Sequence, residues 1–72
     1  MMSSDQKLNE LRREIAERQR YIEGQEVLIE VLERDGHDVV EQQISLNREL
    51  SVLATQIAQQ FELVMKTIKK VE

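Results

Sequence analysis

Apolar residues recur at alternating steps of three and four in both halves of this chain, and the two halves mirror each other about Gly36. A repeat of this kind is typical of helices that pack along a shared seam. In the first half it comprises Leu8, Leu11, Ile15, Arg18, Ile22, Gln25, Ile29 and Leu32. In the second half it comprises Val40, Gln43, Asn47, Leu50, Ala54, Ile57, Phe61 and Val64. Folding the chain at Gly36 pairs residues whose numbers sum to 72, such as Ile15 with Ile57. The pattern therefore predicts an all-α fold, an antiparallel two-helix coiled-coil hairpin.

The signals that end one helix and begin the next lie two residues apart. Gly36 suits the left-handed backbone conformation that terminates many helices. Asp38, with Glu41 three residues later, has the pattern of a capping box at the start of a second helix. So short a connection makes the two helices antiparallel neighbours. We expect a single domain of three segments: a helix over about 4–34, a turn over 35–38 and a helix over about 39–71.

The alternative to the hairpin is one continuous helix that pairs in parallel with a second copy. In that fold the repeat would continue from Ile29 and Leu32 to Gly36, which places a glycine in the seam. The capping residues would also fall in the middle of a helix, where they are unfavourable. Both features favour the hairpin.

A second group of apolar residues lies beside the expected seam. An isolated hairpin would expose on the order of several hundred Å² there, which is close to the upper limit for a monomer. We therefore expect two hairpins to form a homodimeric four-helix bundle, with a tetramer left open. Gly24 would let a partner helix approach, although a glycine tolerated at the surface is an equal alternative. The expected interface is one flank: Tyr21, Gly24, Leu28, Val31, Val39, Leu46 and Leu53.

Polar residues interrupt the seam at two levels. Gln25 falls opposite Asn47, where two amides can pair and penalise slipped registers. Arg18 falls opposite Ala54, where its stem can cover the small side chain while the guanidinium reaches water. A ligand pocket within the bundle is the alternative explanation of both. A pocket needs convergent polar groups, however, and these levels are scattered.

The sequence offers no constellation of residues typical of catalysis. It has one His and no Cys, and it lacks a glycine-rich phosphate loop. The single His37 lies in the turn, where its presence needs no chemical role. Pairs such as Glu10 and Glu14 lie outside the seam and lack the Glu-x-x-His motif of di-metal bundles. We predict no enzymatic activity, no cofactor and no metal site.

Nucleic acid is the competing partner class, because basic residues gather towards the open end of the hairpin. A hairpin dimer could present such residues to phosphates. The net charge of -4, the interspersed acidic residues and the lack of an aromatic placed for base stacking argue against this. A nucleic-acid-binding regulator is therefore the alternative function. Its patch would be Lys7, Arg12, Arg13, Lys66, Lys69 and Lys70.

Membrane and secretory roles are not expected. No apolar run approaches the roughly 20 residues that a membrane-spanning helix needs, and the start of the sequence lacks the apolar stretch of a secretory signal. We expect a cytoplasmic protein that binds itself and another protein. The leading hypothesis for its function is a scaffold or regulatory adaptor that acts by protein–protein contact.

The region around the turn also carries a resemblance. The Ile- and Leu-rich stretch from Arg18 onwards, which ends in Gly36-His37-Asp38, is similar to a family of short proteobacterial helical hairpins without established activity. This resemblance covers about half of the chain and implies a bacterial origin and a helical hairpin; the second helix departs from the family pattern. In size and architecture the chain also resembles Rop-like hairpin dimers, which bind paired RNA loops, but it has no matching motif.

Overall fold

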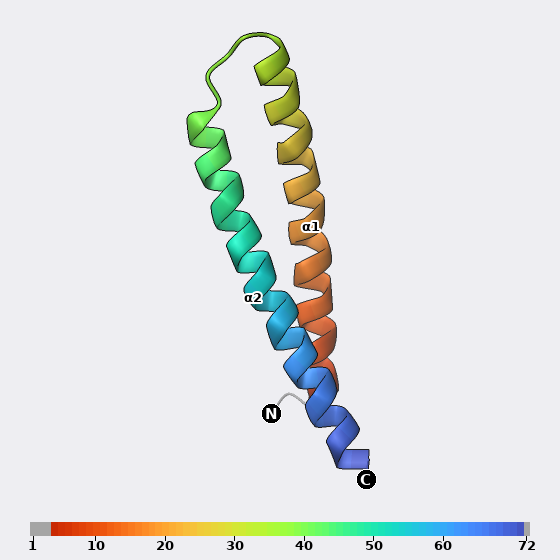
Figure 1. The fold of residues 1–72 in the computed structure, drawn as a ribbon. Helices are drawn as coiled ribbons and strands as arrows, with labels where there is room; N and C mark the ends of the chain where they lie inside the picture. The colour runs from red at the N-terminus through yellow and green to blue at the C-terminus, as the bar shows by residue number, and fades with distance from the viewer. Residues whose placement is uncertain (1–3, 72) are drawn as a thin grey trace.

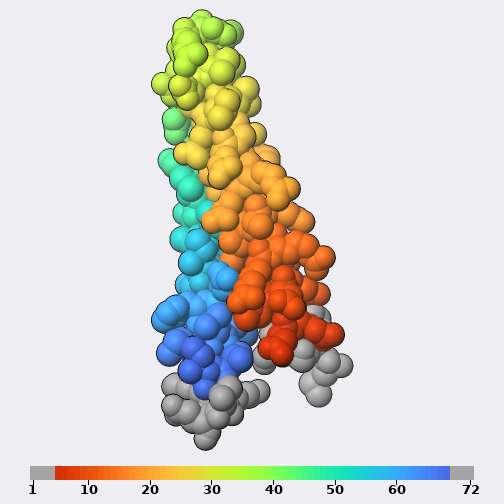
Figure 2. All heavy atoms as spheres, turned by 90° about the vertical axis from the view of Figure 1, so that its right-hand side faces the viewer, coloured from red at the N-terminus to blue at the C-terminus, as the bar shows by residue number. Residues whose placement is uncertain are grey.

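Two long helices make up the computed structural model, which describes the backbone of residues 4–71 and the side chains of residues 5–68. Helix α1 spans Ser4–Arg34 and helix α2 spans Val40–Val71. They run antiparallel, side by side, as a rod with extents of 57 × 19 × 15 Å (Figure 1). The helical hairpin predicted from the sequence is confirmed. Figure 2 views one flank of the rod, and atoms of both helices are visible along most of its length.

The end of α1 is a Schellman motif, a pair of hydrogen bonds that closes the last helical turn. The amide of His37 donates to the carbonyl of Leu32 over 2.9 Å, and the amide of Gly36 donates to the carbonyl of Glu33 over 3.0 Å. Gly36 has a φ of 84°, which a residue with a side chain rarely adopts. A glycine at this position therefore lets the chain reverse direction immediately after α1.

The start of α2 is capped by Asp38. Its Oδ1 atom accepts a hydrogen bond of 3.0 Å from the amide of Val40, which satisfies one of the unpaired donors of the first turn. The carboxylate of Glu41 is exposed and, within the described residues, does not complete the second half of a capping box. One side chain thus caps this end of the helix where the sequence predicts two.

The buried side chains of α1 follow the predicted repeat. Ile22 and Ile29 each expose only 4% of their surface, and Leu8, Leu11 and Ile15 are nearly as well covered. Burying an aliphatic side chain of this size contributes about 1.5–3 kcal/mol. The remaining members of the repeat, Arg18, Gln25 and Leu32, are half-buried.

The seam of α2 is turned by one residue from the predicted one, so the predicted pairs that sum to 72 are wrong for this helix. Leu46 is buried in a cluster with Ile22 and Ile29, and Val39 and Leu53 pack against the same cluster. A shift of one position rotates a helix by about 100°. Four apolar residues assigned to the seam are exposed instead: Val40, Leu50, Ile57 and Phe61.

Arg18 supplies a physical reason for this rotation. Its guanidinium forms an ion pair with Glu49 and donates from Nε to Oε1 of Gln56 over 2.9 Å. Charge-assisted bonds of this kind are stronger than neutral ones. The predicted rotation would have placed Ala54 opposite Arg18, with no acceptor for the charge. The observed rotation provides a carboxylate and still leaves α2 an apolar stripe for the core.

Candidate functional site

The most distinctive surface of the molecule is a row of exposed apolar side chains along α2. Its members recur at intervals of a helical turn or two from the first residue of the helix to its last described side chain, so they share one side of the helix. Their exposed fractions range from 40% at Met65 to 66% at Phe61. We name this the α2 apolar face, and its members are Val40, Ile44, Leu50, Ile57, Phe61, Met65 and Ile68.

The α2 apolar face is larger than the apolar patches that monomers normally expose. From the exposed fractions, its seven side chains leave roughly 700 Å² in contact with water, against about 300–600 Å² for the largest patch of a typical monomer. Isolated apolar residues at a surface need no explanation, whereas an exposed apolar area of this size on one side of a helix is typical of binding surfaces.

The middle of the α2 apolar face is narrow. Bulky residues occupy its two ends, whereas Ser51, Ala54 and Ala58 are small, exposed and lie on the same side of the helix near its centre. Small side chains allow another helix to approach closely, since interaxial distances of 8–10 Å depend on the residues at the contact. The middle of the α2 apolar face therefore presents little steric hindrance to the close approach of another helix.

A charged edge runs along α2 beside the α2 apolar face. Glu41, Arg48, Thr55 and Glu62 follow one another at seven-residue intervals, and all four are exposed. None of the three charged members forms an ion pair within the described part of the hairpin. We name this row the α2 charged edge.

The residues that the sequence predicts as the dimer interface do not lie on one surface in the structure. Its α1 members are exposed: Tyr21, Gly24, Leu28 and Val31. Its α2 members lie between the helices instead, because Leu46 exposes only 7% of its surface and Val39 and Leu53 pack on the same cluster. The rotation of α2 thus covers half of the expected interface and exposes the α2 apolar face. Sequence reasoning missed this face as a surface because it assigned most of these residues to the seam.

A polar cluster occupies the middle of the contact between the helices. Besides Glu49, Arg18 contacts Gln56, whose Nε2 atom donates to Oε2 of Glu14 over 3.3 Å. These side chains bond one another and therefore fix the register of the helices. The predicted amide pair is not formed, since Gln25 is half-buried whereas Asn47 is exposed. No group of three or more metal-ligating side chains occurs among the described residues.

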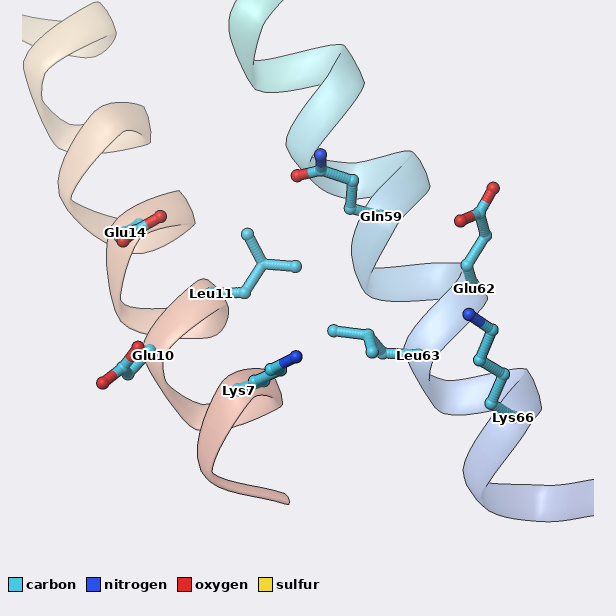
Figure 3. A pocket seen from close by; sticks show the side chains of 8 residues that line it. All are labelled: Lys7, Glu10, Leu11, Glu14, Gln59, Glu62, Leu63 and Lys66. Carbon is cyan, nitrogen blue, oxygen red and sulfur yellow. The ribbon is translucent and has the colours of Figure 1, made fainter. Parts of the chain in front are cut away.

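The open end of the hairpin contains a hollow between the helices (Figure 3). Leu11 of α1 and Leu63 of α2 point into it from opposite sides. Its other lining residues carry charges of both signs: Lys7 and Lys66, with Glu10, Glu14 and Glu62. Two members of the predicted nucleic-acid patch therefore meet here, but beside carboxylates that offset their charge.

The other members of that patch do not join the hollow. Arg12 is exposed, and Arg13 lines a separate hollow with Gln6, Asn9 and Glu10 on α1. The side chains of Lys69 and Lys70 lie outside the described ones. The described part of the structure thus divides the predicted basic residues between two places.

Neither helix, over the residues described, has the length and apolar character required to cross a bilayer. The resemblances to proteobacterial hairpins and to Rop-like dimers stay predictions. Comparison of the chain with models of protein families, with curated proteins and with solved structures found no match.

Proposed function

We propose that this protein is a non-enzymatic interaction module that self-associates through the α2 apolar face and acts as a scaffold or regulatory adaptor. The observation that carries this proposal is the exposure of seven large apolar side chains on one side of α2. The homodimeric four-helix bundle expected from the sequence is retained, but we move its interface from the predicted flank to this face.

The energetics support a stable complex. Burying roughly 700 Å² of apolar surface on each partner yields on the order of 15 kcal/mol or more per partner at about 25 cal/mol per Å². Association costs about 4–15 kcal/mol in lost translational and rotational freedom, plus the ordering of side chains. When two such faces pack together, the free energy gained by burying their apolar surface exceeds this cost of association.

A binding role fits the polar groups better than catalysis does. The polar side chains of the Arg18 cluster line a hollow, but they bond one another and so use their hydrogen-bonding groups within the hairpin. The nucleic-acid alternative has weaker support, because Lys7 and Lys66 share their hollow with three glutamates.

Replacement of Phe61 tests the proposal. Phe61→Glu places a charge at the most exposed position of the α2 apolar face, and we expect it to convert a dimer into a monomer. The matched control is Val27→Glu, because Val27 is exposed to a similar extent, 61% against 66% for Phe61, but lies on α1. The measurement is molar mass by light scattering over micromolar concentrations.

Three outcomes of that experiment would contradict the proposal. A wild-type mass of 8.5 kDa across the whole concentration range would mean that the chain does not self-associate. A Phe61→Glu variant that keeps the mass of the dimer would remove the α2 apolar face from the interface. A Val27→Glu variant that dissociates equally would place the contact elsewhere.

A further inference from the structure

We propose that the helix bound on the α2 apolar face is α2 of a second copy of this chain, held antiparallel, with Arg48 of each chain beside Glu62 of the other. This inference rests on the proposed function. It adds the direction of the contact and the residues that select the partner.

The size of the α2 apolar face fits a second copy. A copy offers an equal face, so the pair would bury about 1,400 Å² in total, within the range of about 1,200–2,000 Å² for stable interfaces. The side-chain sizes agree as well. With the small residues near Ala54 placed at the two-fold axis, the bulky N-terminal end, which includes Val40 and Ile44, meets the bulky C-terminal end, which includes Met65 and Ile68.

Charge decides the direction. When Thr55 of both chains lies near the axis, residues of the α2 charged edge meet if their numbers sum to about 110. Arg48 then lies beside the partner's Glu62. This pair carries opposite charges, and pairs beside the seam of two helices set their orientation.

A parallel pair would lose these contacts. In a two-fold symmetric parallel pair the α2 charged edges of the two chains lie on opposite sides of the contact, so Arg48 would not meet the partner's Glu62. The edge would then contribute no ion pair between the chains, which favours the antiparallel arrangement.

The charges needed for this pairing are available. Glu41, Arg48 and Glu62 are exposed and have no ion-pair partner within the described hairpin. Glu49, the neighbour of Arg48, is different because it already pairs with Arg18. The hairpin therefore uses one carboxylate of this region internally, whereas Glu62 lines the hollow at the open end without forming an ion pair within the described residues.

Single cysteines test the direction, since the chain has none of its own. In the antiparallel pair two copies of residue 55 lie close together, whereas two copies of residue 41 are separated by about 40 Å at 1.5 Å per residue. We expect a short bismaleimide to crosslink Thr55→Cys into a covalent dimer and to leave Glu41→Cys uncrosslinked. A chain that dimerises but whose Thr55→Cys variant does not crosslink, or whose Glu41→Cys variant crosslinks as efficiently, would overturn the inference.

Charge reversal tests the pairing itself. We expect Arg48→Glu and Glu62→Arg each to weaken the dimer by about tenfold, and the double variant to restore wild-type affinity. The control is Arg20→Glu on α1, which changes the net charge equally and should leave the affinity unchanged. Circular dichroism of each variant verifies that the helices persist.

The outcomes separate the two proposals. Single reversals without effect, or a double variant as weak as the single ones, would overturn the Arg48–Glu62 pairing while the dimer stands. A wild-type chain that neither crosslinks nor associates would contradict the proposed function itself.

Discussion

The two helices of this hairpin use their apolar side chains in different ways. Helix α1 turns its apolar repeat inwards, and five of its side chains are buried against α2. Helix α2 buries Leu46 alone among its described residues and leaves eight large apolar side chains exposed to water, seven of them on the α2 apolar face. A rod of two helices can cover only one side of each, so a helix with two apolar stripes must expose one of them.

This difference separates the residues that hold the hairpin together from those of the proposed binding surface along one helix. Val39, Leu46 and Leu53 hold α2 against α1, while Leu50, Ile57 and Phe61 face away from that contact. Substitutions on the two stripes should therefore have distinguishable effects. Substitutions between the helices should lower the free energy of unfolding by the same amount at every protein concentration. Substitutions on the α2 apolar face should instead weaken the dimer.

The largest effect is expected at Ile29, which is buried at the centre of the cluster between the helices. Ile29→Ala should lower the free energy of unfolding by about 2–4 kcal/mol, because it removes buried methyl groups and leaves a cavity. Urea titration followed by circular dichroism measures this loss. The comparison variant is Ile57→Ala on the α2 apolar face, whose effect should grow with protein concentration. Equal, concentration-independent losses for the two variants would break the distinction between the stripes.

A smaller effect is expected at the turn, where the chain reverses direction after α1. Gly36→Val should lower the free energy of unfolding by about 1–2 kcal/mol, because a β-branched residue is strained at the φ of 84° that Gly36 adopts. The strain is purely conformational, since a Cβ at this position would contact nothing within 4 Å. Thermal unfolding is the measurement, and an unchanged midpoint would show that Gly36 does not need the left-handed conformation.

The sequence predicted the features that local signals determine. Gly36 and Asp38 mark the turn because their backbone and side-chain chemistry acts within a few residues. The seam of α1 was predictable because that helix has one dominant apolar repeat, and its buried residues match it from Leu8 to Ile29.

The rotation of α2 could not be predicted in the same way. Its two apolar stripes lie one residue apart, and counting apolar positions favours the richer stripe, which includes Leu50, Ile57 and Phe61. The choice also depends on a contact between distant residues, the ion pair of Arg18 with Glu49. The rotation of α2 determines which of its two apolar stripes is exposed, so an incorrect rotation also led to an incorrect position for the candidate surface. The signal that was present is the seven-residue spacing of Val39, Leu46 and Leu53.

The smallest effect is expected for a substitution of Gly24, which tests whether the dimer contact lies on the α2 apolar face or on the flank predicted from the sequence. Gly24 lies in the middle of α1, is exposed, and a Cβ built there would contact nothing within 4 Å. Gly24→Ala should therefore raise the free energy of unfolding by about 0.5–1 kcal/mol, because alanine favours helix more than glycine does. Since the proposed contact runs along α2, the same variant should leave the dimer affinity unchanged. Thermal unfolding and sedimentation equilibrium measure the two quantities.

A stabilised hairpin with a weakened dimer would instead mean that a partner helix lies against Gly24. Binding would then occur on α1 as well, and the division of roles between the helices would no longer hold.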